Sequence, residues 1–197
     1  VILRRGESGN AERVCELMRW GMVPHWADDV SIGNKMINAR SETVAEKPAF
    51  RDAMKYRRCF LPADGFYEWQ QRDDGKQPWY FTGRQTPLLA LAGLWESYDY
   101  PGDRRIDACT ILTCDANRTM RPIHHRMPVI LTADHWRTWL TLPPEKAAEL
   151  ARLLVPAAPD MLRAWPVTRE VNRPAFDEPA CIEPIWDEPN GQLNLFR

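Results

Sequence analysis

Short runs of apolar residues, most ending at turn-forming residues, recur along this chain and predict strands. The expected strands cover 14–20, 58–71 (as one long strand or two), 79–82, 88–95, 109–112, 127–131 and 162–168. The triplet Asp73-Asp74-Gly75 predicts a hairpin turn within this series. Apolar residues at helical spacing predict helices at 46–56, 133–140 and 144–154, and they allow a short helix at 115–120. Many strands with a few interspersed helices indicate an α+β fold, or a barrel-like sheet with packed helices.

Composition narrows the class of protein without identifying it. The 197 residues suit one domain, and the fractions of 44% hydrophobic and 27% charged residues are ordinary for a globular protein. No apolar run approaches the length of a transmembrane helix. The formal net charge of −1 does not by itself support nucleic-acid binding, although the segment 51–58 is basic and the segment after Arg173 is acidic.

The cysteines and histidines argue against a metal site. Five cysteines at irregular spacing form no CxxC pair, so we interpret them as reduced and mostly buried thiols: Cys15, Cys59, Cys109, Cys114 and Cys181. The four histidines have no cysteine or aspartate at ligand spacing. We therefore expect neither a metal nor another cofactor.

Three polar residues of catalytic type lie at the edges of apolar segments. Glu68 lies between Tyr67 and Trp69, where a carboxylate is costly to bury unless it has a partner or a chemical role. His124 follows Pro-Ile and precedes a strand-like run, and Asn38 follows Met-Ile. An Asn, a Glu and a His in such settings make a candidate acid–base site.

Each of these residues also has an ordinary structural explanation. A strand glutamate such as Glu68 more often pairs with a nearby arginine on a half-exposed surface. A lone histidine is more often structural than catalytic, and the adjacent pair His124-His125 leaves the choice between two imidazoles open. Asn38 and Arg40 could cap a turn and form a surface ion pair.

Three segments resemble one protein family closely, and further motifs occur in the same order. The three are Ile37-Asn38-Ala39-Arg40-Ser41-Glu42-Thr43, Gly65-Phe66-Tyr67-Glu68-Trp69 and His124-His125-Arg126-Met127-Pro128. The others are Trp20-Gly21-Met22-Val23-Pro24-His25-Trp26, Lys76-Gln77-Pro78-Trp79-Tyr80, Ala92-Gly93-Leu94-Trp95-Glu96, Leu112-Thr113-Cys114-Asp115-Ala116 and Trp165-Pro166-Val167. One short motif would be weak evidence, but an ordered set argues against chance. The chain resembles the SRAP proteins (SOS-response-associated peptidases, or abasic-site processing proteins).

The resemblance implies a fold and a division of the chain. The family has a curved, largely antiparallel, β-barrel-like core with peripheral helices and one cleft. This domain would cover 1–173. The acidic, proline-containing segment 174–197 is expected to form a loop or a flexible tail.

The resemblance also implies roles for individual residues. Asn38, Glu68 and His124 match the family's catalytic residues, and Arg40 matches the arginine that holds a DNA phosphate. An arginine suits phosphate because its planar fork can donate two hydrogen bonds at once. Trp26 would form a wedge or stacking surface for bases, with an ordinary core tryptophan as the alternative. Thr113 and Arg126 are further DNA-binding candidates, as phosphate contacts or as supports of the catalytic residues.

The family's nucleophile is an N-terminal cysteine. Its free α-amine forms a Schiff base with the aldehyde of an abasic site, and its thiol then closes a thiazolidine ring. The sequence begins at Val1, and its five cysteines have their nitrogens in peptide bonds. We therefore expect the family's N-terminal segment to be missing here, and the chain as written to form no crosslink. If that segment carries a core strand, its loss would expose a sheet edge and favour association.

The sequence thus predicts an abasic-site processing protein. It would bind single-stranded DNA with abasic sites, crosslink to them through the N-terminal cysteine, and use the same site as an autoproteolytic peptidase. We expect it to be cytoplasmic, nucleoid-associated when bound to DNA, without membrane contact, and monomeric when complete. One alternative is a non-catalytic single-stranded DNA-binding module without the nucleophile, which the intact Asn38, Glu68 and His124 argue against. Another is an unrelated hydrolase, which the ordered motifs argue against.

Overall fold

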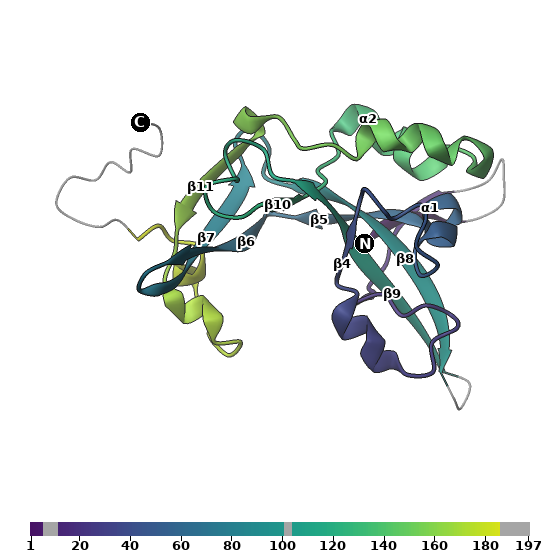
Figure 1. Cartoon of the computed structure of the whole chain (residues 1–197), viewed down its shortest axis with the longest axis horizontal. Coiled ribbons are helices and arrows are strands. Elements are labelled where there is room, and N and C mark those ends of the chain that lie inside the picture. Colours follow the sequence, from purple (N-terminus) through teal and green to yellow (C-terminus); the bar gives the residue numbers. More distant parts are fainter. Residues whose placement is uncertain (6–11, 101–103, 186–197) are drawn as a thin grey trace.

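The computed structural model describes residues 1–5, 12–100 and 104–185, and two sheets form the frame of this part of the chain (Figure 1). The larger sheet has the strand order β10-β9-β8-β5-β1-β2, with β3 and β4 paired in parallel to β9. The smaller sheet has the order β11-β7-β6. The strands are β1 (Ile2–Arg5), β2 (Glu12–Cys15), β3 (Arg19–Trp20), β4 (Asn38–Arg40), β5 (Arg58–Ala63), β6 (Gly65–Arg72), β7 (Gly75–Gly83), β8 (Leu89–Tyr100), β9 (Arg104–Asp115), β10 (Arg126–Pro128) and β11 (Leu162–Pro166).

The chain passes from the larger to the smaller sheet at Asp64, between β5 and β6. The hydroxyl of Thr82 on β7 donates to the Asp64 carbonyl over 2.6 Å and holds this crossing point. In Figure 1 the smaller sheet lies on the left and the larger one on the right. The predicted segment 58–71 is therefore two strands in two different sheets, and Glu68 lies on β6 of the smaller sheet.

The residues directly after β10 lie between β8 and β9 at one end of the larger sheet. The amide of Val129 donates to the Leu112 carbonyl of β9, and the amide of Ala92 in β8 donates to the Val129 carbonyl, each over 2.8 Å. The segment 116–125, which carries His124, comes directly before β10. Its C-terminal end is therefore anchored in the sheet.

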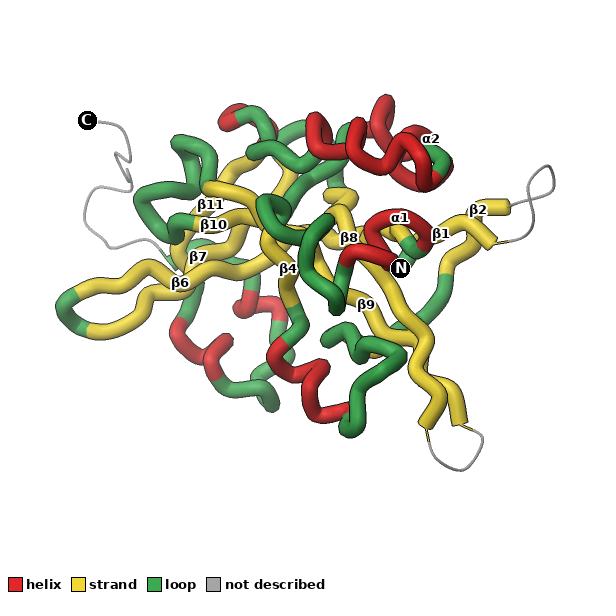
Figure 2. The backbone as a smooth tube through the Cα atoms, turned by 45° about the vertical axis from the view of Figure 1, so that its right-hand side comes forward, coloured by secondary structure: helices red, strands yellow, loops and turns green. Residues whose placement is uncertain are grey.

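Helices lie around the periphery of the sheets (Figure 2). They are α1 (Arg51–Tyr56), α2 (Ala133–Thr141) and the 3-10 helices η1 (Val30–Lys35), η2 (Pro144–Leu153), η3 (Pro159–Met161), η4 (Arg169–Asn172) and η5 (Pro179–Cys181). The main core lies where α1, α2 and η2 pack on the larger sheet, and Trp139 of α2 is fully buried there. Its indole donates to the Cys59 carbonyl of β5 over 2.7 Å, so apolar packing and one buried hydrogen bond fix α2. No helix in the described ranges is long and apolar enough to cross a membrane.

The α+β class and the curved, largely antiparallel core are confirmed, and the larger sheet is open rather than closed into a barrel within the described residues. The hairpin turn before Gly75 is also found, with Gly75 at a φ of 113°. The segment 14–20 forms the two short strands β2 and β3 instead of one. The segment 144–154 is helical, but as the 3-10 helix η2.

The prediction of a short helix at 115–120 is wrong, because Asp115 is the last residue of β9, where it pairs with Arg126, and turns follow from 118 onward. Asn117 Oδ1 accepts hydrogen bonds from the amides of Thr119 and Met120, at 3.1 and 3.0 Å, and the backbone forms turns there.

The predicted helix 46–56 begins only at Arg51. Pro48 has no amide hydrogen to donate, and the residues before Arg51 form turns.

The described part of the C-terminal segment lies against the smaller sheet. Tyr67 donates its hydroxyl hydrogen to the Cys181 carbonyl, Trp165 donates its indole hydrogen to the Ile182 carbonyl, and the Ile185 amide donates to the Pro166 carbonyl. These contacts hold residues up to 185 in place. The remainder of the predicted flexible tail, 186–197, lies outside the described residues.

Candidate acid–base site

Glu68 and His124 come together from different parts of the chain. Glu68 lies on β6, His124 lies just before β10, and Glu68 Oε2 is 3.5 Å from His124 Nδ1. Both side chains are partly buried, with 24% of Glu68 and 34% of His124 exposed. The pair is therefore reachable from solvent but partly shielded from it, as acid–base chemistry requires.

Burial raises the pKa of Glu68 above its ordinary value. The charge of His124 and the backbone amide of Trp69 act in the opposite direction, but the loss of hydration is the largest influence. In the register of β6 and β7, Glu68 lies opposite the buried Trp79, whereas Tyr67 lies on the other face of the strand. A glutamate with a raised pKa can exchange protons closer to neutral pH than an exposed one.

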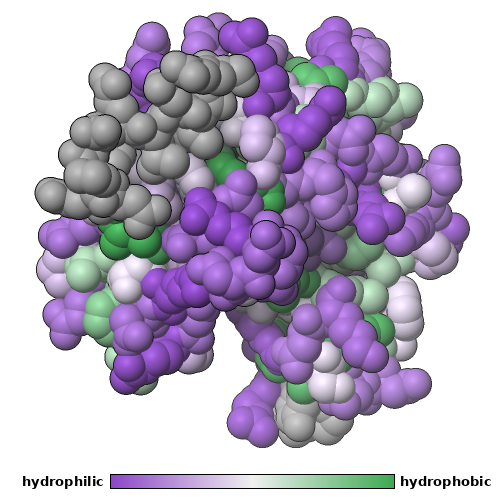
Figure 3. All heavy atoms as spheres, turned by 60° about the vertical axis from the view of Figure 1, so that its left-hand side comes forward, coloured by the Kyte–Doolittle hydropathy of each residue, from purple (hydrophilic) through white to green (hydrophobic). Residues whose placement is uncertain are grey.

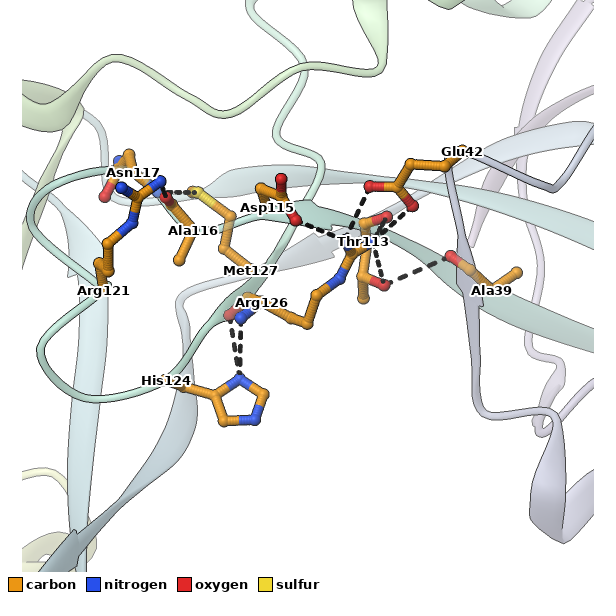
Figure 4. A network of polar contacts seen from close by, with 10 residues as sticks. All are labelled: Ala39, Glu42, Thr113, Asp115, Ala116, Asn117, Arg121, His124, Arg126 and Met127. Atoms are coloured by element: carbon orange, nitrogen blue, oxygen red, sulfur yellow. Dashed lines mark hydrogen bonds and ion pairs between the residues drawn. The ribbon is translucent and has the colours of Figure 1, made fainter.

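The backbone of Arg126 gives His124 Nδ1 a partner in either protonation state. The Arg126 amide lies 3.2 Å from Nδ1 and can donate to it, and the Arg126 carbonyl lies 3.1 Å away and can accept from it. The imidazole can therefore gain or lose the Nδ1 proton without losing a hydrogen-bond partner. Figure 4 shows these two contacts on the same ring nitrogen.

The segment that carries His124 is also tied to β6. Gln70 lies two residues after Glu68, and its side-chain amide donates to the Pro122 carbonyl over 3.2 Å. This contact links the strand of the glutamate to the segment of the histidine, which supports the short distance between the two side chains. His125 is exposed, with its ring centroid 4.6 Å from that of His124, and of the two imidazoles the one at 124 contacts Glu68.

Asn38 and Arg40 lie on the exposed face of β4, with the buried Ala39 between them. The strand runs parallel to β9, with Asn38 opposite Ile111 and Arg40 opposite Thr113. Because side chains alternate along a strand, the amide and the guanidinium are on the same face. The structure therefore offers a polar and a cationic side chain to solvent at this edge of the larger sheet.

Arg126 is held by several acceptors. Its guanidinium donates to Glu42, to Asp115 and to the carbonyl of Thr113, with the Thr113 hydroxyl 3.5 Å away (Figure 4). Thr113 thus contacts Arg126 directly and lies beside Arg40 in register. The sequence interpretation gave no role to Glu42, which lies in the turn directly after β4.

Trp26 is 51% exposed in a turn closed by a hydrogen bond from the Ala27 amide to the Pro24 carbonyl. This exposure favours the surface interpretation over an ordinary core tryptophan. Trp20, which had no separate role in the sequence interpretation, is 55% exposed, and its indole donates to the Ile37 carbonyl directly before Asn38. The surface is hollowed into a notch along the lower edge of Figure 3, between two lobes of the molecule.

All five cysteines are free thiols, and three of them are buried. Burial raises the pKa of Cys59 and Cys109, and it raises the pKa of Cys114 to about 11. These three are therefore protonated and poor nucleophiles at neutral pH. No cluster of three or more His, Cys, Asp or Glu side chains that could hold a metal occurs among the described residues.

The fold and site together define a sheet-rich α+β protein with a Glu–His acid–base pair and exposed polar, cationic and aromatic side chains. The family model described as SOS response associated peptidase (SRAP) matches residues 1–174. The chain belongs to this family.

Named relatives and solved structures agree with this membership. The chain is 42% identical over 167 residues to "Abasic site processing protein YoqW" of Bacillus subtilis, covering 84% of this chain and 75% of the relative. It is 36% identical to "Abasic site processing protein HMCES" of Gallus gallus, covering 91% of this chain and 60% of the relative. A crystal structure from Bacteroides thetaiotaomicron matches with a TM-score of 0.80 at 28% identity, covering 86% of this chain and 76% of that one. Family membership supports a role in abasic-site processing.

Proposed function

We propose that the protein binds single-stranded DNA that carries an abasic site and, with a cysteine at its N-terminus, forms a covalent crosslink to that site. The observation that carries this proposal is the Glu68–His124 pair, 3.5 Å apart on a partly buried face. A protein that only binds DNA has no need of a carboxylate whose pKa is raised by burial beside an imidazole.

The chemistry needs several proton transfers. The α-amine attacks the C1 aldehyde of the ring-opened sugar, water leaves, and a Schiff base forms. The thiol then adds to the imine carbon, its proton passes to the nitrogen, and the thiazolidine ring closes. Glu68 exchanges protons with the attacking amine and the leaving water, and His124 orients or protonates the sugar oxygen. The double hydrogen-bonding capacity of His124 Nδ1 allows such an exchange without movement of the ring.

Asn38 would hold the terminal amine and thiol by hydrogen bonds. It lies on the exposed face of β4, and its amide can both donate and accept. The same site would cleave the peptide that precedes the cysteine in an immature chain, since that cleavage needs the same acid–base groups.

Arg40, Trp26, Thr113 and Arg126 would contact the DNA. The exposed guanidinium of Arg40 can take a phosphate, and the exposed indole of Trp26 can stack on a base. Thr113 and Arg126 lie together beside Arg40 and would contact a phosphate or support the groups that do.

The test uses the protein with a cysteine-led segment ahead of Val1 and single-stranded DNA that bears one abasic site. A denaturing gel should show a shifted band that is lost when the terminal cysteine is replaced by alanine. Glu68→Gln should slow its formation by about 10²-fold or more, the typical contribution of a general acid–base group. Glu145→Gln, at an exposed position of η2, is the matched control and should react at the normal rate.

Binding is measured separately on intact single strands. Arg40→Ala should weaken binding and reduce the dependence of log affinity on log salt by about one phosphate contact. Binding without any shifted band would contradict the crosslinking proposal and favour the non-catalytic module. If the protein shows neither binding nor a shifted band, both the crosslinking proposal and the non-catalytic module are overturned.

A further inference from the structure

The residues of the proposed site lie on separate segments of the chain. Asn38 and Arg40 belong to β4, a strand of three residues whose pairing partner is β9. Glu68 belongs to β6 in the other sheet, and His124 to the segment before β10. A short strand needs further contacts to keep its register, so the groups that join β4 to the His124 segment matter for the site.

Arg126 and Glu42 provide this link. Glu42 follows β4 by two residues, and its carboxylate meets the guanidinium of Arg126 in a two-point contact. Arg126 Nη1 donates to Glu42 Oε1 over 2.7 Å, and Nη2 donates to Oε2 over 2.9 Å. This parallel arrangement fixes both distance and orientation, in contrast to a single contact between flexible side chains.

The remaining contacts of Arg126 make the link rigid. Its Nη2 donates to the Thr113 carbonyl over 2.7 Å, and its Nη1 donates to Asp115 over 2.9 Å, both on β9. The side chain of Arg126 is only 14% exposed. The hydrogen bond from Arg126 is the largest of the influences that lower the pKa of Glu42, so this carboxylate is ionised at neutral pH.

The same arginine supplies the backbone partners of the histidine. The amide and the carbonyl of Arg126 are the two groups that contact His124 Nδ1, at 3.2 and 3.1 Å. Figure 4 shows the chain of contacts from Glu42 through Arg126 to the imidazole. Arg126 therefore contacts Glu42 through its side chain and, through its backbone, the ring that contacts Glu68.

We propose that Glu42 is a positioning residue. Its two-point contact with Arg126 holds the His124 imidazole and the β4 segment in the relative arrangement that the reaction needs. This inference rests on the proposed function for its kinetic consequence. An ordinary surface ion pair would be the alternative, but a two-point contact to a largely buried guanidinium is not the usual form of such a pair.

The test measures the rate of crosslink formation at saturating abasic-site DNA, using the protein with a cysteine-led N-terminal segment. Glu42→Gln should slow this rate about ten-fold, and Glu42→Ala at least as much. Glu46→Gln, at an exposed position of the same loop, is the matched control and should leave the rate within two-fold. In an Arg126→Ala background, Glu42→Gln should cause no further loss, because its effect acts through Arg126.

A structural readout keeps the inference independent of the crosslinking activity. The ring ¹⁵N chemical shifts of His124 report its hydrogen bonding, and they should change in Glu42→Gln and stay constant in Glu46→Gln, with both variants folded. A normal rate and unchanged shifts in Glu42→Gln would overturn the inference, as would a further ten-fold loss in the Arg126→Ala background. If the parent protein forms no crosslink but the His124 shifts still respond to Glu42→Gln, the proposed function fails and the positioning role stands.

Discussion

Arg58 is the side chain whose replacement should reveal most about how the core is held together. It is buried, and its guanidinium donates hydrogen bonds to four backbone carbonyls at the C-terminal ends of two helices. The acceptors are Met54 (2.9 Å) and Lys55 (2.5 Å) of α1, Trp139 (2.6 Å) of α2, and Leu142 directly after α2. These are carbonyls that a helix end leaves without a backbone partner, and the helix dipole makes them favourable sites for a cation.

The structure allows an estimate of the cost of Arg58→Met. The substitution keeps an apolar stem but leaves the carbonyls without a donor, and those of Met54 and Trp139 belong to buried residues. Two buried unsatisfied groups at about 1–3 kcal/mol each give a loss of about 2–6 kcal/mol. Burial lowers the pKa of Arg58 to about 10, so the charge itself is costly, and removing it offsets part of the loss. We expect a net destabilisation of about 3 kcal/mol.

Urea unfolding measures this change. With a dependence of about 2 kcal/mol per M, the midpoint should fall by about 1.5 M at an unchanged slope. Arg51→Met is the matched control, because Arg51 lies on the same helix with its side chain 55% exposed, and it should shift the midpoint by less than about 0.3 M. A loss of unfolding free energy below about 1 kcal/mol for Arg58→Met would refute the view that this guanidinium caps the C-terminal ends of the two helices.

Three further predictions concern other parts of the molecule. Gly21 and Gly75 have φ angles of 109° and 113°, but only at Gly21 would a Cβ meet a backbone oxygen, at 2.5 Å. Gly21→Ala should therefore lower the unfolding free energy by at least about 1 kcal/mol more than Gly75→Ala in urea titrations, and equal losses would contradict the clash. The raised pKa of Glu68 means that the folded state binds this proton more tightly than the unfolded chain, so stability is lost as pH rises above the ordinary value of 4.5. Glu68→Gln should consequently stabilise the protein more at neutral pH than near pH 4.5, and a pH-independent gain in thermal unfolding would oppose this reasoning. Glu96 is buried and lies 2.6 Å from Arg57, so Glu96→Ala should cost about 2 kcal/mol, and a loss below about 0.5 kcal/mol would show that solvent screens the pair.

Local signals predicted a good part of the fold. The Asp-Asp-Gly turn before β7 depends on four neighbouring residues, and helix α2 follows from apolar spacing within one segment. Such features depend on contacts close in the sequence, so the sequence displays them directly. The helix expected at 115–120 is absent because its first residue, Asp115, belongs to β9 and pairs there with Arg126, a contact that local spacing does not display.

The candidate site was predicted in part. Polar residues at the edges of apolar segments drew attention to Asn38, Glu68 and His124, and the structure places two of them in contact. Glu42 was not singled out, because its importance comes from a guanidinium that lies 84 positions away in the sequence. No local pattern distinguishes it from an ordinary surface glutamate.

The sequence by itself determined which chemical groups the protein has, the strands and turns that local patterning imposes, and its likeness to one family. Only the tertiary structure decided which groups meet. The contact of Glu68 with His124 and the ion pair of Glu42 with Arg126 each join segments that are far apart in the sequence. The burial that raises the pKa of Glu68 likewise arises from the packing around it. Distances and local dielectric are properties of the packed chain, since each depends on residues remote in sequence.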